Sequence, residues 1–161
     1  MFPVATTLKY IESHPMQNDE SQDKWMLAEG DEEGQHLLFR VRQELPAGVL
    51  KMNYPELISV FWEFDAEEND GMPDEETSEV HFEFEQAVHP LDAPEYSYLM
   101  LVITGGGRKE WHFYARDEAE WIDQLNELLA DHPEYPLQIE VSADPEWSLY
   151  SNVMDGIAGA S

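Results

Sequence analysis

The chain has 161 residues, no cysteine, and a net charge of −27 from 35 acidic and 8 basic residues. This composition excludes disulfides and cysteine-bound metals, and it argues against direct binding to nucleic acid or anionic lipid, which need clustered positive charge. Hydrophobic residues make up 42% and aromatic residues 12% of the chain, which is enough for the core of one domain.

The N-terminal part of the chain is predicted to contain a hairpin that follows a loosely docked arm. Residues 1–22 show little periodicity and form the arm. Lys24–Glu29 and His36–Gln43 have strand patterns and flank a turn that contains two glycines. In the second strand apolar and polar side chains alternate, so we expect one buried face and one polar face.

The middle of the chain is predicted to contain a strand and then a helix. Leu57–Phe64 is rich in β-branched and aromatic residues, which favour a strand. Asp74–His89 is ambiguous, because Val80–Phe84 alternates like a strand while Thr77, Val80, Phe84 and Val88 recur at helical spacing. Pro73 and the three acidic residues after it suit a first helical turn, so we expect a helix.

The C-terminal half is predicted to contain a hairpin, a helix, a strand and a short terminal helix. Gly105–Gly107 forms the turn of the hairpin. Asp117 and Glu120 resemble a capping box at the start of the helix, whose apolar residues form one stripe. The hairpin consists of Tyr96–Thr104 and Lys109–Ala115, and the helix is Asp117–Asp131. The strand is Leu137–Val141, and the short terminal helix is Pro145–Val153.

From Leu57 onward the predicted order is β-α-β-β-α-β, which is the split βαβ order of a ferredoxin-like fold. We therefore expect one α+β domain over residues 23–154. It has an antiparallel sheet with two helices on one face, and the N-terminal β-hairpin is added to it. Residues 155–161 are expected to form a frayed tail.

Three stretches of the sequence resemble a bacterial family of unknown function. They open the first helix, span the hairpin and lie near the end of the chain: Gly71–Glu76, Gly107–Asp117 and Asp144–Tyr150. Together they are similar to the uncharacterised "domain of unknown function 695" family over most of Asp23–Met154, and this resemblance implies no reaction and no cofactor. A more distant, fold-level similarity is to the regulator of ribonuclease E activity B family, whose members bind and inhibit a large nuclease.

No motif for catalysis or metal binding stands out. The six histidines lack the spacing of known zinc sites, and no serine lies in a GxSxG motif. We therefore expect no cofactor and no catalytic residue. A weak calcium-loop pattern has an aspartate where the loop needs glycine, so a solvated acidic loop is favoured. Its residues are Asp65, Glu67, Asn69 and Glu76.

The return strand of the hairpin contains a candidate binding face. Trp111 and Phe113 are expected to pack under the helices, which turns the alternate side chains to the other face of the sheet. These are Arg108, Glu110, His112 and Tyr114. If open, this face is a site for a small molecule or a reaction. In the alternative that we favour, the N-terminal hairpin covers it through Arg40 and Arg42.

The distribution of charge indicates a different function. Residues 52–107 contain 14 acidic residues and residues 117–161 contain 11, and neither segment contains Lys or Arg. We expect the helical face to bind a basic protein, as a non-catalytic regulator, inhibitor or immunity-type protein. Solubility is a simpler explanation of the same acidity. The expected surface comprises Glu75, Glu76, Glu79, Glu83, Glu120, Asp123 and Glu127.

Two further expectations concern assembly and compartment. The high charge disfavours self-association, so we expect a monomer or a weak homo-oligomer joined at a sheet edge. Met1–Glu12 does not have the pattern of a signal peptide, and the longest apolar stretch is too short to span a bilayer. With the absence of cysteine, these features indicate a cytoplasmic protein.

Overall fold

A computed structural model describes residues 7–15, 24–32, 34–43, 45, 48–66 and 71–159. Within these residues, seven strands form one antiparallel sheet in the order β1-β2-β3-β5-β6-β4-β7. The strands are β1 (Thr7–Pro15), β2 (Lys24–Glu32), β3 (Gln35–Arg42), β4 (Glu56–Glu63), β5 (Ser97–Gly105), β6 (Arg108–Ala115) and β7 (Leu137–Ala143). The helices are α1 (Glu75–Val88), α2 (Glu118–Leu128) and α3 (Ser148–Gly159), with short 3-10 turns η1 (Lys51–Asn53) and η2 (His89–Leu91).

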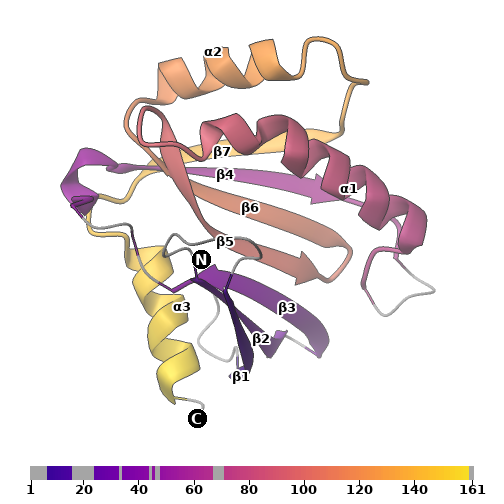
Figure 1. Ribbon diagram of the computed structural model, residues 1–161. Coiled ribbons are helices and arrows are strands. Elements are labelled where there is room, and N and C mark those ends of the chain that lie inside the picture. Colours follow the sequence, from indigo (N-terminus) through magenta and orange to yellow (C-terminus); the bar gives the residue numbers. More distant parts are fainter. Residues whose placement is uncertain are drawn as a thin grey trace.

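The sheet is covered on both faces. Figure 1 shows α1 and α2 over one face, and α3 on the other side beside β1–β3. Phe84 of α1 and Trp121 of α2 pack with Trp111 and Phe113 of β6 in one apolar cluster. Tyr150 of α3 belongs to a second cluster that includes residues of β2, β3 and β5. The expected α+β class is confirmed, and both predicted helices lie on one face.

The central strand β5 is buried along almost its whole length. Its side chains alternate between the two clusters until a bulge between Leu99 and Leu101, where the register with β6 shifts. Because the bulge inserts one residue, Met100 and Leu101 both face the α3 side. A strand buried on both faces needs a nearly continuous apolar run, which this segment has.

The two helices over the sheet begin where the sequence predicts. The Asp74 side chain accepts a hydrogen bond from the Thr77 backbone N–H at 2.8 Å, and Asp117 accepts one from Glu120 N–H at 2.9 Å. Each carboxylate satisfies an N–H group that the first helical turn leaves unpaired. The helical prediction for the ambiguous segment is confirmed, with Phe84 and Val88 buried at a spacing of one turn.

The glycine turn of the β5–β6 hairpin depends on a close approach between backbones. Gly105 has a φ of +145°, and a Cβ atom there would lie 2.3 Å from the backbone oxygen of His36 in β3. Gly106 and Gly107 also have positive φ values, of 64° and 76°. A side chain at position 105 would therefore separate β3 from β5, where Leu37 pairs with Gly105.

Both ends of the chain differ from the sequence-based expectation. Residues 7–15 form β1, within the segment 1–22 that the sequence predicts as an arm, and β1 pairs with β2. Among the described residues β1 is an edge strand that pairs only with β2, and its sequence shows little alternation of polar and apolar residues, so the sequence alone does not reveal this strand. At the other end α3 continues to Gly159 and buries Ile157, so the described part of the segment predicted as a frayed tail is helical. Residues 160–161 lie outside the described residues.

Tyr114 and Asp144 attach α3 to the sheet. The Tyr114 hydroxyl donates to Asp144 Oδ2 at 2.7 Å, and Asp144 accepts the N–H groups of Ser148 (2.8 Å) and Leu149 (3.1 Å) at the start of α3. The Tyr114 ring stacks on Trp147 with ring centroids 4.2 Å apart. Burial raises the pKa of Tyr114. Burial also acts to raise the pKa of Asp144, but the hydrogen bonds that this carboxylate accepts have the larger combined effect, so its pKa lies below the ordinary value.

Substitution Tyr114→Phe removes the hydroxyl and keeps the stacked ring. We expect the free energy of unfolding to fall by about 2 kcal/mol, because the lost bond joins a buried hydroxyl to a charged carboxylate. Urea unfolding followed by circular dichroism measures it. Tyr96→Phe is the control, since that hydroxyl makes a long bond of 3.4 Å to Gln124. Equal losses in both variants would contradict the assignment.

Candidate functional site

The outer side of α1 and α2 is an acidic surface. All seven residues that the sequence predicts for it are exposed, and α1 contacts α2 directly. Glu75, Glu79 and Glu83 follow each other at intervals of four residues and so lie along one line of α1. On α2, Glu120, Asp123 and Glu127 share a side in the same way. The structure therefore gathers these side chains on neighbouring helices, which we call the acidic helical face.

One apolar side chain stands within the acidic helical face. Phe82 of α1 is 64% exposed, three residues after Glu79 and next to Glu83. The opposite side of α1 holds the buried residues Phe84 and Val88. Phe82 belongs to a stretch that alternates like a strand, so its exposure is not evident from the sequence. The signal that finds it is the helical spacing, which puts Phe82 away from the core.

On the opposite face of the sheet, three of the four predicted residues form a hydrogen-bonded row. His112 Nδ1 lies 2.8 Å from Ser59 Oγ of β4, and His112 Nε2 lies 2.9 Å from Glu110 Oε1. Arg108 donates to Glu110 Oε2 through Nε at 3.0 Å and through its terminal nitrogen at 2.7 Å. We call Ser59, His112, Glu110 and Arg108 the histidine row. Ser59 belongs to no recognisable motif and is 53 residues from His112, so the sequence alone does not identify it as a member of this row.

The protonation of the histidine row follows from its partners. A carboxylate only accepts hydrogen bonds, so His112 Nε2 donates to Glu110 and, in the neutral ring, Nδ1 accepts from the Ser59 hydroxyl. Burial raises the pKa of Glu110, but His112 and Arg108 outweigh it and hold that pKa below its ordinary value. The order serine, histidine, carboxylate is that of hydrolase triads. However, Ser59 and His112 are buried, so the hydroxyl is not presented to a substrate.

Tyr114 is not part of the histidine row. It is buried beneath α3 and bonded to Asp144. The expectation that Arg40 and Arg42 cover this face is wrong, since Arg40 binds Glu85 of α1 and Arg42 binds Asp92 after η2, both on the helical side. The reason is the register of β3, in which the apolar side chains Phe39 and Val41 turn toward α3 and the arginines turn the other way.

The described residues bear on two expectations, namely the weak calcium-loop pattern and the absence of a membrane-spanning segment. Of the weak calcium pattern, Asp65 and Glu76 are described, whereas Glu67 and Asn69 lie outside the described residues. Within the described part of the chain, no three His, Asp or Glu side chains are grouped as a metal site would need. In that same part, every helix is too short or too polar to cross a bilayer.

A buried histidine lies under the acidic helical face. His81 of α1 is 1% exposed, and its ring packs against Trp62, Phe64 and Trp111 at centroid distances of 4.7, 5.4 and 5.7 Å. Neither ring nitrogen has a hydrogen-bond partner among the described residues. Burial, and then the charge of Lys109, lower the pKa of His81 to about 4. The ring is therefore neutral at pH 7.

Comparison with known proteins gives one family match. A family model described as "Family of unknown function (DUF695)" matches residues 23–154. No curated protein and no solved structure matches the chain. These comparisons do not confirm the more distant similarity to the regulator of ribonuclease E activity B family.

His81 makes folding sensitive to acid. The unfolded chain has an ordinary histidine pKa near 6.5 and binds a proton more tightly than the folded protein, so stability is lost as the pH falls from about 6.5 toward about 4. Between pH 7.5 and pH 5 this contribution amounts to about 2 kcal/mol. We expect His81→Leu to remove that part of the pH dependence, as measured by urea unfolding at both pH values.

His132→Leu is the matched control, because His132 is exposed. It should leave the difference between the two pH values as in the unsubstituted protein. If His81→Leu and the unsubstituted protein lose equal stability on acidification, His81 does not have the lowered pKa.

Proposed function

Since the chain belongs to the DUF695 family of unknown function, which brings no reaction with it, we propose a function from the charge of its surface. The protein is a non-catalytic acidic module that binds a basic protein partner, as a regulator, an inhibitor or an immunity-type protein. The observation that carries this proposal is the exposed ring of Phe82 among the carboxylates of the acidic helical face.

Phe82 supports binding over mere solubility. An exposed aromatic ring does not increase solubility. Interfaces, by contrast, commonly have an aromatic anchor surrounded by polar groups that exclude water. Glu79 and Glu83 lie beside Phe82 on α1, and Glu75 extends the same line by one turn. The arrangement fits a partner that has an apolar pocket bordered by Lys or Arg side chains.

Among the described residues, no ion pair joins a base to the seven carboxylates of the acidic helical face. No Lys or Arg occurs between Met52 and Gly107 or after Arg116, so neither helix contributes a base. A surface of one sign accelerates encounter with a partner of opposite sign, and salt weakens the effect because the Debye length is about 8 Å at physiological ionic strength. Association should therefore be fast at low salt. The apolar contact of Phe82 should supply the part of the binding free energy that salt does not remove.

We also propose that β4–β7 with α1 and α2 form a ferredoxin-like split βαβ unit. Three observations support it: the chain order β4-α1-β5-β6-α2-β7, the sheet order β5-β6-β4-β7 with antiparallel pairing, and two helices on one face. In this arrangement the helices cover one face only, so α1 and α2 present their outer sides together.

A small-molecule or enzymatic role for the histidine row is the weaker alternative. Tyr114 lies under α3, and Ser59 and His112 are buried within the sheet face. The carboxylate of Glu110 is already shared between Arg108 and His112. In these hydrogen bonds the buried polar groups of the histidine row satisfy one another, so we assign the row no reaction.

Charge reversal on the acidic helical face tests the proposal. We expect the triple variant Glu75→Lys, Glu79→Lys and Glu83→Lys to lose the basic proteins that the tagged protein retains from lysate at low salt. The single variant Phe82→Ser should no longer retain the partner that the unsubstituted protein still binds at moderate salt. Quantitative mass spectrometry of the retained proteins measures both.

The control is a second triple reversal at exposed positions off that face: Glu140→Lys, Glu146→Lys and Asp155→Lys. It changes net charge by the same amount, so any effect of total charge is equal in the two variants. Loss of the same proteins from both variants would show non-specific attraction and would overturn the proposed face.

A further inference from the structure

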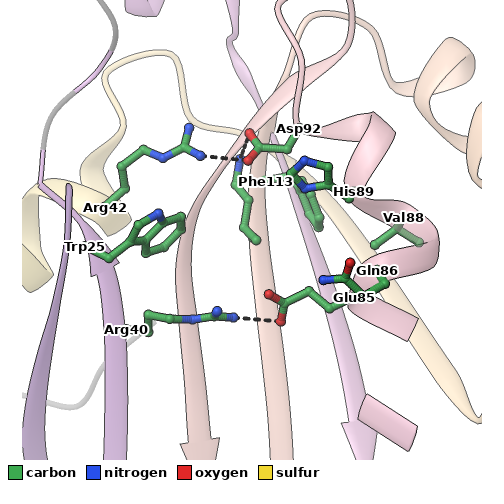
Figure 2. A pocket seen from close by; sticks show the side chains of 10 residues that line it. Trp25, Arg40, Arg42, Glu85, Gln86, Val88, His89, Asp92 and Phe113 are labelled. Carbon is green, nitrogen blue, oxygen red and sulfur yellow. Dashed lines mark hydrogen bonds and ion pairs between the residues drawn. The ribbon is translucent and has the colours of Figure 1, made fainter. Parts of the chain in front are cut away.

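A cleft lies between the N-terminal hairpin and α1, apart from the acidic helical face and the histidine row. Trp25 and the side chains of β3 form one wall, and α1 with the segment after it forms the other (Figure 2). Its lining residues are Trp25, Arg40, Arg42, Glu85, Gln86, Val88, His89, Asp92, Leu99 and Phe113.

Two ion pairs cross the cleft at its two ends. Arg40 donates to Glu85 Oε1 at 2.7 Å, and Arg42 donates to Asp92 Oδ2 at 2.7 Å (Figure 2). The guanidinium carbons of Arg40 and Arg42 lie 5.4 and 5.0 Å from the centroid of the Trp25 ring. Trp25 therefore holds both cations against one aromatic surface, which limits the positions they can take.

Positive charge collects at this cleft although the chain is strongly acidic. Arg40 and Arg42 are two of only eight bases in the chain. A third, Lys109, is close enough that burial, and then the charge of Arg40, lower its pKa below the ordinary value. Among the described residues Lys109 contacts the ring of Trp111 but makes no ion pair. Within the described part of the chain, the lining of the cleft thus brings together the two arginines and the two carboxylates of Glu85 and Asp92, with the partly buried Lys109 nearby.

Arg40 retains hydrogen-bonding capacity toward the cleft. A guanidinium has five N–H donors, and within the described residues Arg40 uses only its terminal Nη2 nitrogen, toward Glu85. Its side chain is 34% exposed, so the remaining donors are reachable. A second carboxylate could therefore bind Arg40 in the bidentate geometry that guanidinium groups favour.

The floor of the cleft is apolar. Val88, Leu99 and Phe113 line it opposite Trp25, and the space amounts to about 70 Å³. This is enough for a few carbon atoms, so the occupant is small or only partly enclosed. Small-molecule sites commonly combine such a floor with a few polar groups that fix orientation.

We infer that this cleft binds a small organic carboxylate with an apolar body, whose carboxylate is held by Arg40 and whose body lies between Trp25 and the floor. The ligand carboxylate competes with Glu85 for Arg40, and Lys109 compensates the added negative charge. Burial raises the pKa of Glu85, but Arg40, Trp111 and Lys109 outweigh it and keep this residue ionised. Because Glu85 competes with the ligand carboxylate for Arg40, a substitution of Glu85 should change the affinity for the ligand.

Benzoate is the probe, with isobutyrate and acetate as smaller carboxylates and benzylamine as the cation of similar shape. Two-dimensional NMR of the full chain follows the indole N–H signals of the five tryptophans. We expect benzoate to shift the signal of Trp25, and that of Trp111 because its Nε1 donates to Glu85 at 2.9 Å. The signal of Trp147, on the α3 side of the sheet, should stay in place.

Two substitutions separate binding from a purely structural role of the ion pair. Arg40→Gln should weaken benzoate binding about tenfold, because it removes a charge-assisted partner. Glu85→Gln should instead strengthen binding about threefold or more, because it removes the competitor and frees donors of Arg40. Both break the same ion pair, so a structural effect alone would act in one direction. Thermal unfolding of each variant verifies that it is folded.

Matched controls remove the effect of total charge. Arg108→Gln breaks an ion pair on the opposite face, and Glu83→Gln removes one charge from the outer side of α1. Both should leave the benzoate affinity within about twofold. The inference is overturned if benzoate moves no indole signal, if benzylamine binds as well as benzoate, or if Glu85→Gln weakens binding.

Discussion

The β5–β6 hairpin is buried from both sides, and the other elements are arranged to satisfy this constraint. Trp111 and Phe113 are covered by α1 and α2, whereas Tyr114 and Met100 are covered from the side of α3. Two apolar faces require two covering layers, and each layer turns its polar residues outward. The acidic helical face is therefore the outer side of elements whose inner side is set by packing. Its carboxylates lie in water, where their charge costs little.

Two of the bases, Arg40 and Arg42, instead lie between layers. Arg42 is buried with Asp92, and Arg40 reaches from β3 to Glu85 of α1. These pairs connect the N-terminal hairpin to the helical layer, so positive charge is used inside the fold rather than on the helical surface. Such partly buried pairs are weak sources of net stability, because desolvation offsets their attraction. Their consequence is a separation of charge, with acidic outer sides on the helices and a cleft in which bases are paired with carboxylates.

Helix α1 contributes to both proposed binding regions. Its outer line of glutamates with Phe82 faces solvent, while Glu85 points to the cleft and Phe84 to the core. Successive positions of a helix differ by about 100°, so three consecutive residues serve three environments. The ligands that we propose for the two regions differ in chemistry, namely a basic protein surface outside and a small carboxylate within. The histidine row on the other face belongs to neither region, since its members satisfy one another.

The sequence alone determined the parts that depend on local physics. Asp74, Asp117 and the glycines at 105–107 mark the starts of the helices and the turn, because capping and positive φ are properties of a few neighbouring residues. The charge of α1 and α2 could also be read directly. Only the tertiary structure decided that Ser59 meets His112, that Arg40 meets Glu85, and that Tyr114 lies under α3 rather than on an open face. Those contacts depend on strand order and register between distant segments, which no local pattern encodes.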